Sequence, residues 1–416
     1  MNTGTLIVGA GQAGAQVASA LRGLGYDESI TLVGAERWGP YHRPPLSKAF
    51  LLADAPTESL EIRSDTFFRD NSITLVTGEP IERVDLQGQS AVGASGKHHG
   101  FDRLVLATGV APVKLSVPGC DLPGVMYLGG LDDAIALKAR LASSERLVVV
   151  GGGYIGLELA ASARVLGKAV TVLEMADRLL QRVAPPAIGE FFLDLHRQRG
   201  VDVRLGTTLA RIDGDERGVS AVELSSGERI EADTVVIGVG SRPQSALARQ
   251  MGLSVLPSGA IEVDEFMQTS HARVLAVGDC AAAPDPAGRH ARLQIPSIQS
   301  ALNQARVAAA TIAAKPQASA AIPWFWSDQY DIKLQIVGHG APHDDIVVRG
   351  DPGTHRFSVF SYCGDKLASA AVINRPADFM QVRKCIEMQL AVDRTLIADE
   401  STSMADIFKA HQRSPQ

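Results

Sequence analysis

Two glycine-rich segments carry the clearest chemical pattern in this chain of 416 residues, GAGQAG at 9–14 and GGGYIG at 151–156. Both fit GxGxxG, in which the first glycine makes a tight turn, the second lets backbone approach a pyrophosphate, and the third lets a helix pack closely on a strand. The phosphates would lie at a helix N-terminus, whose free N–H groups and dipole favour an anion. The residues predicted to bind two dinucleotides here are Gly9, Gly11, Ala13, Gly14, Gly151, Gly153, Tyr154, Ile155 and Gly156.

An acidic residue roughly 20 positions after the glycines is expected to bind the ribose hydroxyls. In the second segment Glu174 stands there, directly after the apolar run 170–173. A carboxylate accepts hydrogen bonds from a ribose diol and repels a 2′-phosphate, so Glu174 favours NADH over NADPH. In the first segment Ala35 stands at the expected position and Glu36 follows it. Either Glu36 reaches the ribose through a small backbone shift, or the adenosine half is held in another way.

The segments around the glycines must position them. Each glycine segment follows a short apolar run, precedes a small-residue stretch typical of a helix, and is followed by a second β-branched run. These ranges are 6–8, 15–21 and 30–33 in the first copy, and 148–150, 157–166 and 170–173 in the second. The order strand–turn–helix–strand therefore occurs twice, which predicts doubly wound parallel sheets.

Further apolar runs at 104–107, 235–237 and 274–277 suit strands that are covered on both faces. A turn that contains glycine follows each run. Ligands of open α/β sheets bind beyond the carboxyl ends of the strands, where these turns lie. The turn residues predicted to bind a cofactor are Thr108, Gly109, Gly240 and Asp279.

Two dinucleotide sites require two ligands. A nicotinamide and a flavin are a natural pair, because the flavin accepts a hydride and releases electrons singly. The predicted cofactors are therefore FAD and NADH. Holding the two rings in near-attack geometry would supply most of the catalysis, so no strong acid or base is needed.

Composition argues against several other classes. The net charge of −6 gives no reason to expect a nucleic-acid partner or an anionic membrane surface. We expect no secretory signal at the start of the chain, and no apolar run is long enough to span a bilayer. The four cysteines are widely spaced, which predicts neither a zinc site nor a CxxC pair but thiols in a reducing cytoplasm. No metal is predicted.

The hydrophobic pattern of the chain changes after the Pro/Ala/Ser-rich stretch 315–323, which is typical of a linker. Alternating segments at 333–337 and 356–362 predict an antiparallel sheet, and a helix is expected near 380–390. This region is predicted to be a third, smaller domain.

Five motifs follow one another along nearly the whole chain. They are YHRPPLSK at 41–48, LATG at 106–109, GGGYIGLE at 151–158, AVGDC at 276–280 and WFWSDQY at 324–330. Together they resemble the ferredoxin reductases of oxygenase systems. The resemblance implies an α/β fold with two doubly wound, Rossmann-type nucleotide-binding domains and a C-terminal α+β domain. The FAD domain would comprise 1–112 and 245–320, the NAD domain 113–244, and the C-terminal interface domain 321–416.

The resemblance also implies roles for single residues. Lys48 would lie near the isoalloxazine, where a cation stabilises reduced flavin, although a lysine at a helix start can simply lie on the surface. Glu158 would lie near the nicotinamide and position its carboxamide or the incoming ring; a surface helix charge is the alternative. Asp279 would bind the ribityl chain of FAD at a helix N-terminus. The other FAD contacts implied are Arg43, Ile81, Ile298 and Trp326.

The implied partner is a [2Fe–2S] ferredoxin that feeds a cytochrome P450 or a Rieske oxygenase. It would dock near Arg306 and the stretch from Trp324 to Tyr330. A cation at Arg306 could steer an acidic ferredoxin, although an ordinary exposed arginine is an equal alternative. Closely spaced tryptophans are more often core or interface residues than electron conduits, so Trp324 and Trp326 are assigned a structural and docking role.

The chain departs from the family pattern at three positions around the expected FAD site. Gly129 takes the place of an arginine and Pro296 that of a glutamate, in addition to Ala35. These departures bear on single contacts and on FAD affinity. The motifs that match are too numerous to discard the cofactor.

Three other functions are alternatives to this one. A rubredoxin reductase would differ mainly in its acceptor. A disulfide oxidoreductase needs a reactive cysteine pair beside the flavin, and the stretch PPLSK at 44–48 contains none. A redox-sensing flavoprotein of the apoptosis-inducing-factor type would turn over slowly, and we find neither a targeting segment nor a basic tail that would support it.

Overall fold

The chain forms two compact units in the computed structural model, which describes residues 4–285, 288, 291–318, 322–340 and 345–413. Unit 1 comprises Met1–Arg43, Ala55–Ala111 and Ser241–Pro323, and unit 2 comprises Pro44–Asp54, Pro112–Gly240 and Trp324–Gln416. Each unit therefore contains one of the two glycine segments.

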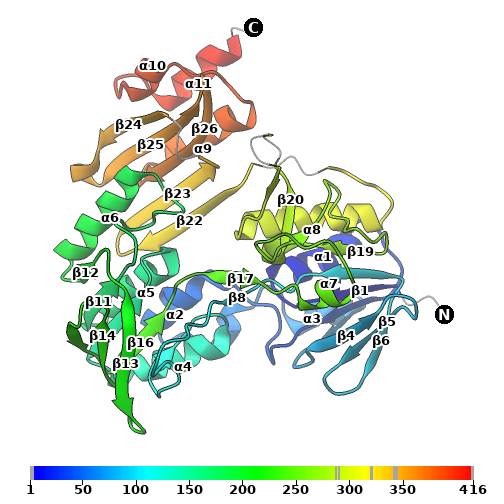
Figure 1. The fold of residues 1–416 in the computed structure, drawn as a ribbon. Coiled ribbons are helices and arrows are strands. Elements are labelled where there is room, and N and C mark those ends of the chain that lie inside the picture. The colour runs from blue at the N-terminus through cyan, green and yellow to red at the C-terminus, as the bar shows by residue number, and fades with distance from the viewer. Residues whose placement is uncertain (1–3, 286–287, 289–290, 319–321, 341–344, 414–416) are drawn as a thin grey trace. The chain divides into compact units, whose positions relative to one another are not determined.

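Unit 1 is built on a parallel sheet with the strand order β19-β7-β1-β2-β3 (Figure 1). The strands are β1 (Thr5–Val8), β2 (Ile30–Val33), β3 (Ile73–Val76), β7 (Arg103–Leu106) and β19 (Val274–Ala276). Helix α1 (Gln12–Gly23) packs on β1 and β2 and also contacts α8 (Ile298–Ile312). The inner strand β1 and the edge strand β19 are both wholly buried, and the predicted run 274–277 is thus covered on both faces.

Smaller elements complete unit 1. The helices are η2 (Thr57–Leu60), α3 (Asp65–Asp70), α7 (Ala246–Gln250) and η3 (Gly278–Cys280). One antiparallel sheet contains β4 (Ile81–Asp85), β5 (Ser90–Gly93) and β6 (His98–Gly100), and another sheet contains β18 (Ile261–Glu262), β20 (Ala281–Pro284) and β21 (Arg292–Leu293). A short ribbon of β8 (Val110–Pro112) and β17 (Ser241–Pro243) lies where the chain passes between units.

The first part of unit 2 repeats the parallel plan, with the strand order β12-β11-β10-β16-β9. The strands are β9 (Val125–Met126), β10 (Arg146–Val150), β11 (Ala169–Leu173), β12 (Asp202–Arg204) and β16 (Thr234–Ile237). The helices are η1 (Pro44–Ser47), α2 (Ala49–Leu52), α4 (Leu131–Ser143), α5 (Tyr154–Val165) and α6 (Pro186–Gln198). A separate antiparallel sheet contains β13 (Leu209–Asp215), β14 (Gly218–Leu224) and β15 (Arg229–Glu231). The predicted second strand–turn–helix–strand is thus confirmed.

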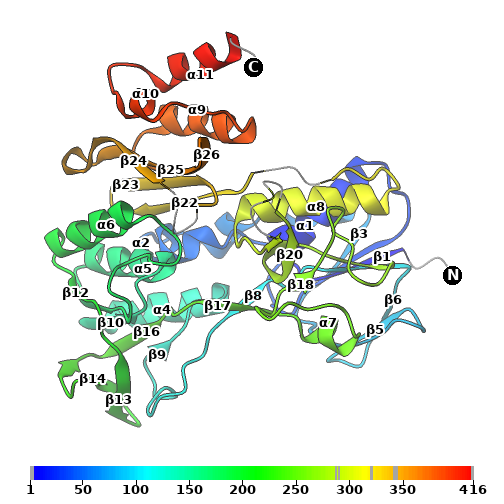
Figure 2. The same cartoon turned by 45° about the horizontal axis from the view of Figure 1, so that its top comes forward.

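The C-terminal part of unit 2 is an antiparallel sheet in the order β22-β23-β26-β25-β24. Its strands are β22 (Trp324–Gln329), β23 (Ile332–Gly338), β24 (Asp345–Asp351), β25 (Arg356–Cys363) and β26 (Lys366–Ile373). The helices are η4 (Pro352–Thr354), α9 (Pro376–Glu387), α10 (Arg394–Ala398) and α11 (Met404–Arg413). Figure 2 shows α9 over one side of this sheet and α5 and α6 on the other. The predicted antiparallel sheet is confirmed.

One predicted segment end lies within the described residues and another lies outside them. The helix expected near 380–390 begins at Pro376, which is favourable in a first turn, and ends before Gln389, whose φ of 51° is not helical. The predicted boundary at 320/321 falls on residues outside the described ranges. The three-domain division stays a prediction. Within the described residues, none of the helices is both long and apolar enough to cross a lipid bilayer.

Candidate cofactor site

The first glycine of each segment makes a turn that other residues could not make. Gly9 has a φ of 115° and Gly151 a φ of 111°, in the region that L side chains rarely adopt. A Cβ on Gly9 would lie 2.1 Å from the carbonyl oxygen of Ala107, and a Cβ on Gly151 would lie 2.4 Å from that of Gly238. Each turn is therefore pressed against the end of a neighbouring strand.

The third and second glycines have different reasons to be glycine. A Cβ on Gly14 would lie 2.0 Å from the Gly9 oxygen, and a Cβ on Gly156 would lie 2.1 Å from that of Gly151, so helix and turn can touch only at glycine. A Cβ on Gly11 or Gly153 would meet no atom within 4 Å, although each is the N-cap of its helix. Open space at a helix N-terminus is what a pyrophosphate requires, so both turns fit a dinucleotide.

The buried Oε1 atom of Gln12 supports this fit in unit 1. Gln12 is the first residue of α1, and the described residues supply no hydrogen-bond partner for that oxygen. A buried polar atom without a partner costs free energy. A ligand at the N-terminus of α1 could supply the missing donor. Ala13, the next predicted contact, is buried in the same turn.

Glu174 holds the second glycine turn through backbone N–H groups. Its Oε2 accepts a hydrogen bond from Gly152 N at 2.6 Å, and its Oε1 accepts one from Ala176 N at 2.8 Å. Each carboxylate oxygen can accept more than one hydrogen bond, so the ribose hydroxyls can still bind. The position and orientation of Glu174 thus fit the predicted role.

Glu36 is held differently in unit 1. Tyr41 Oη donates a hydrogen bond to Glu36 Oε2 at 2.6 Å, and the Arg43 guanidinium is paired with Oε1. The side chain remains 38% exposed, and Ala35 before it is exposed. Side chains rather than the glycine turn therefore hold this carboxylate. Its role as a ribose ligand stays a prediction.

Asp279 lies in η3, directly after the buried strand β19. Burial raises the pKa of Asp279 to about 6, while the positive charge of Arg43 opposes the increase. Gln294 donates to the Asp279 carbonyl at 2.7 Å, and Gln304 accepts from Gly278 N at 2.7 Å, so this turn is fixed from both sides. A half-buried carboxyl group in a fixed turn suits the binding of hydroxyl groups that replace water.

The remaining predicted contacts of unit 1 lie near these turns or in its core. Thr108 Oγ1 donates to the Gln244 carbonyl at 2.5 Å, which fixes the turn that continues into Gly109. Ile298 is the first residue of α8, and this helix contacts η3. Ile81 begins β4 and packs against the hydrophobic core.

The structure shows the surroundings of Gly129 and Pro296, two of the departures from the family pattern. A Cβ on Gly129 would lie 2.9 Å from Cδ of Pro112, so an arginine at this position would require Pro112 to move. Pro296 is exposed and directly precedes Ser297, the N-cap of α8. Ser297 Oγ accepts from Ser300 N at 3.1 Å, so the helix start is capped without the missing glutamate.

A half-buried Lys48 and a buried Glu158 form an ion pair in unit 2. Lys48 Nζ lies 2.7 Å from Glu158 Oε2, and Glu158 is 5% exposed. Ser47 Oγ donates to the same oxygen at 2.5 Å, and Ser327 Oγ donates to Oε1 at 2.6 Å. Neither Lys48 nor Glu158 is thus a solvated surface charge. Burying two charges costs free energy that pairing only partly returns, so the arrangement depends on all of these donors.

The other predicted residues of unit 2 surround the start of α5 and the strand β22. Tyr154 packs its ring on Phe325 with 5.0 Å between centroids, and burial raises the pKa of its hydroxyl. Ile155 is 50% exposed beside it. Gly240 has a φ of 121°, and a Cβ there would lie 3.6 Å from the Arg182 guanidinium.

The tryptophans of β22 take part in packing. The rings of Trp324 and Trp326 are 5.8 Å apart, and Trp324 also contacts Phe379 at 5.6 Å. The Arg383 guanidinium lies 5.7 Å from the Trp324 ring. These contacts agree with a structural role. Arg306 lies exposed on α8 in unit 1.

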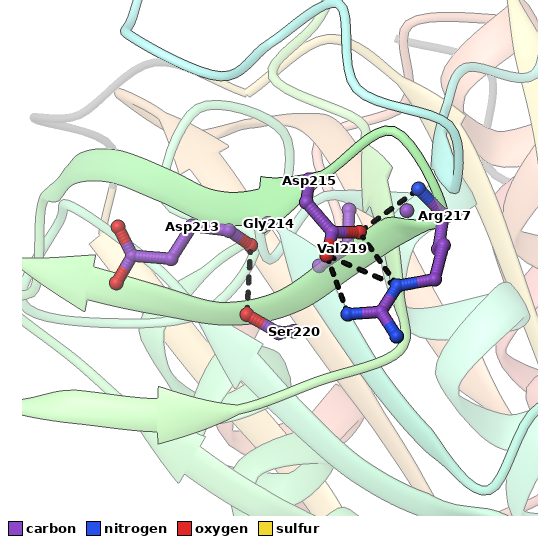
Figure 3. Close-up of a pocket in the computed structure, with 7 residues that line it drawn as sticks. Asp213, Gly214, Asp215, Arg217, Val219 and Ser220 are labelled. Carbon is purple, nitrogen blue, oxygen red and sulfur yellow. Dashed lines mark hydrogen bonds and ion pairs between the residues drawn. The ribbon is translucent and has the colours of Figure 1, made fainter.

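A surface pocket on the β13–β14 hairpin is not part of the candidate site (Figure 3). Its lining residues are Asp213, Gly214, Asp215, Arg217, Gly218, Val219 and Ser220. Arg217 is paired with Asp215 at 2.6 Å within the hairpin. None of the predicted cofactor residues lines it. In the described ranges, no group of three or more His, Cys, Asp or Glu side chains could hold a metal ion.

Sequence reasoning missed several residues that hold the predicted ones. Ser47 and Ser327 donate to Glu158, and Tyr41 donates to Glu36. All three lie inside the motifs that carry the family resemblance. Ser47 and Ser327 are far from Glu158 in the chain, so no spacing rule connects them, whereas Tyr41 is only five residues from Glu36. The sequence predicts Gly152 only as part of the glycine turn, although its N–H donates to Glu174 Oε2.

Comparison with known proteins identifies the family. The sequence profile described as pyridine nucleotide-disulphide oxidoreductase matches residues 3–310, and the profile described as reductase C-terminal matches residues 324–408. The chain belongs to the pyridine nucleotide-disulphide oxidoreductase family. This membership confirms the predicted fold class and the class of enzyme. It also confirms FAD and NADH as the cofactors, for which the two glycine turns provide fitting sites.

The relatives are reductases that match over almost their whole length. The chain is 40% identical to rhodocoxin reductase of Rhodococcus erythropolis, over 98% of this chain and 95% of that protein. A solved complex of putidaredoxin reductase with putidaredoxin is 39% identical, covers 99% of this chain and 100% of its own, and superposes with a TM-score of 0.95. Rubredoxin-NAD(+) reductase of Ectopseudomonas oleovorans is 36% identical over 89% of this chain and 96% of its own. The resemblance to ferredoxin reductases of oxygenase systems is confirmed.

The family name refers to a disulphide, but the cysteines of this chain do not suit disulphide chemistry. All four are free thiols in the structure. Cys280 is fully buried, and burial raises the pKa of its thiol. A raised pKa lowers the thiolate fraction, so Cys280 is a poor nucleophile.

Proposed function

We propose that the protein is an NADH-dependent flavoprotein reductase that passes electrons through FAD to a [2Fe–2S] ferredoxin, which in turn feeds a cytochrome P450 or a Rieske oxygenase. The observation that carries the proposal is the presence of two geometrically equivalent dinucleotide turns in one chain. The near-complete match to putidaredoxin reductase, solved with its redox partner, supports the ferredoxin as acceptor.

The two turns are assigned to different cofactors. FAD belongs to unit 1, with its pyrophosphate at the N-terminus of α1 and its ribityl hydroxyls at Asp279. NADH belongs to unit 2, with its pyrophosphate at the N-terminus of α5. The carboxylate of Glu174 binds the adenosine ribose and repels the 2′-phosphate of NADPH.

The ion pair of Lys48 and Glu158 is assigned to the reacting end of the cofactors. When bound, FAD accepts a hydride and releases electrons singly. Lys48 supplies a positive charge that favours the reduced state, and Glu158 orients the nicotinamide. The pair is largely shielded from water, with side chains 18% and 6% exposed, which strengthens its electrostatic effect.

The ferredoxin is proposed to meet Arg306 and the stretch from Trp324 to Tyr330. Arg306 is exposed, as a residue that steers an acidic partner must be. Trp324 packs on α9 and on Trp326, and the two rings would shape the surface rather than carry electrons. The four free cysteines agree with a reducing cytoplasm as the compartment.

One anaerobic experiment tests the function. The purified protein is mixed with NADH, the flavin absorbance is followed, and a [2Fe–2S] ferredoxin is then added. We expect rapid bleaching by NADH and rapid reoxidation by the ferredoxin. A preparation that neither contains nor binds flavin would overturn the proposal.

A rubredoxin reductase is the second candidate, because a protein of that name is among the relatives. Adding a rubredoxin in place of the ferredoxin separates the two, since the better acceptor reoxidises the flavin at the lower concentration. Bleaching without reoxidation by any of these acceptors would instead favour a slow, redox-sensing flavoprotein.

A further inference from the structure

The carboxylate of Glu158 is the end point of a longer chain of hydrogen bonds within unit 2. Ser327 Oγ lies 2.6 Å from Glu158 Oε1, and Gln329 Nε2 lies 3.2 Å from Ser327 Oγ. Gln329 Oε1 lies 2.8 Å from His196 Nε2, and the Tyr330 hydroxyl lies 3.4 Å from His196 Nδ1. The chain therefore connects the ion pair to the last turn of α6.

The strand β22 forms this chain because alternate residues share one face of a strand. Phe325, Ser327 and Gln329 lie on the same face, and they contact Tyr154, Glu158 and His196, respectively. Tyr154 and Glu158 are four residues apart on α5, so they also share a face. Phe325 and Ser327 on one face of β22 therefore contact Tyr154 and Glu158 on one face of α5.

The Glu158 carboxylate, at the end of the chain of hydrogen bonds, determines which group donates in each of them. An ionised Glu158 can only accept, so Ser327 must donate its proton to it. The Ser327 oxygen then accepts from the Gln329 amide nitrogen, which turns the Gln329 carbonyl oxygen toward His196. His196 must donate from Nε2, which leaves Nδ1 as an acceptor for the Tyr330 hydroxyl. A single orientation of each side chain satisfies all members.

Three members are shielded from water, and the titratable members hold the protonation states that this direction needs. Ser327 and His196 are 0% exposed and Gln329 is 1% exposed. Burial lowers the pKa of His196 to about 4, so the ring is neutral near pH 7 and has one donor and one acceptor nitrogen. Burial raises the pKa of Tyr330 to about 12, which keeps its hydroxyl protonated.

We propose that Ser327, Gln329 and His196 are positioning residues that fix the rotation of the Glu158 carboxylate, and through it the place of the Lys48 ammonium group. The inference rests on the proposed function, in which this ion pair serves the reacting end of the cofactors. Lys48 and Ser47 both bind Oε2, so Ser327 is the donor that occupies Oε1 and prevents the carboxylate from turning.

The test compares substitutions along the chain in the holoenzyme. Ser327→Ala, Gln329→Leu and His196→Leu each remove a donor. In His196→Gln the amide nitrogen can still donate to Gln329. His355→Asn is the matched control, because His355 also contacts α6, through Phe191, but lies outside the chain of hydrogen bonds. Asparagine tolerates the φ of 56° at this position.

Stopped-flow reduction by NADH separates positioning from stability. We expect the limiting rate of flavin bleaching to fall about tenfold in the three variants that lose a donor, with little change in apparent Kd for NADH. The charge-transfer absorbance of reduced enzyme with NAD⁺ should weaken in parallel. His196→Gln and His355→Asn should behave like the wild type. Variants with lower unfolding temperatures but unchanged rates and absorbance would overturn the inference.

A crystal structure of Ser327→Ala gives a result that does not depend on the proposed function. We expect the Glu158 carboxylate to rotate and the Lys48 Nζ to leave its position 2.7 Å from Oε2. An unchanged carboxylate would overturn the positioning role even if NADH reduces the flavin. A wild type that NADH does not reduce, with a rotated carboxylate in the variant, would instead refute the proposed function alone.

Discussion

The two glycine turns have nearly the same backbone but hold their acidic residues in different ways. In unit 2, Glu174 follows the strand directly and accepts hydrogen bonds from backbone N–H groups of the turn and of Ala176. In unit 1, Glu36 comes one position later, and its carboxylate is bound to the side chains of Tyr41 and Arg43. Both units therefore have the same kind of glycine turn, but the contacts that hold the acidic residue beside it differ.

Backbone geometry is the stricter of the two requirements. In either copy, a Cβ at the first or third glycine would lie within 2.4 Å of a carbonyl oxygen. Every residue other than glycine has a Cβ, so no other residue fits these positions. A carboxylate, in contrast, can be held from several directions, because its oxygens accept from backbone or from side chains. One copy could therefore lose the usual acidic position while keeping the turn.

The largest expected effect comes from filling the third glycine of either turn. Gly14→Ala should yield protein without flavin, and Gly156→Ala should yield yellow protein that NADH does not bleach. The new Cβ would lie 2.0 or 2.1 Å from a backbone oxygen, so the helix must move away from the turn. We also expect the free energy of unfolding to fall by about 1–3 kcal/mol. Flavin absorbance before and after NADH measures both losses.

Alanine at the middle glycine is the matched control. A Cβ on Gly11 or Gly153 meets no protein atom within 4 Å, so folding should be unchanged while cofactor affinity falls. Equal destabilisation by all four substitutions would show that the turns serve folding alone and would contradict the assignment of separate roles.

The same contrast explains how much could be predicted from sequence. The strands, the helices after the glycines and the positive φ of Gly9 and Gly151 follow from local patterns, and the structure confirms them. The partners of Glu158 could not be predicted, because Ser47, Lys48 and Ser327 are brought together by tertiary packing of three distant segments. Sequence periodicity predicts local structure and does not show which distant side chains come into contact.

The two units also differ in their buried titratable groups, which gives a pH test. Burial raises the pKa of Asp279 in unit 1 to about 6 and lowers that of His196 in unit 2 to about 4. Folded His196 stays neutral where the unfolded residue, with a pKa near 6.5, takes up a proton. Its contribution to stability is present above pH 6.5 and is lost as the pH falls toward 4.

We therefore expect the wild type to lose stability relative to His196→Gln over that interval, by about 3 kcal/mol at most. Glutamine can donate to Gln329 but cannot ionise, so the difference isolates the imidazole. The difference in unfolding temperature between the two proteins, measured at a series of pH values, checks this. A difference that does not change with pH would show that His196 has the same pKa in the folded and the unfolded protein.

The two acidic anchors should differ in their importance for nucleotide choice. Glu174→Ala should lower the preference for NADH over NADPH by about tenfold, because it removes both a hydrogen-bond acceptor and the charge that repels a 2′-phosphate. Glu36→Gln should change FAD affinity less, because Tyr41 and Arg43 already occupy its carboxylate. The ratio of kcat/KM for the two nucleotides and a flavin-binding titration measure these effects. A larger loss in Glu36→Gln would make Glu36 the true ribose anchor of unit 1 and remove the contrast.

The smallest effect is expected for Arg43, whose charge acts on both Glu36 and Asp279. Arg43 pairs with Glu36 and opposes the rise in the pKa of Asp279. Arg43→Met should raise that pKa further above about 6, by less than one unit because Arg43 is partly exposed and its charge is screened. Nuclear magnetic resonance of labelled aspartate, with Arg69→Met as an exposed control in the same unit, follows the titration. An unchanged pKa would mean that Arg43 serves Glu36 alone, and that unit 1 keeps its two acidic residues electrostatically independent.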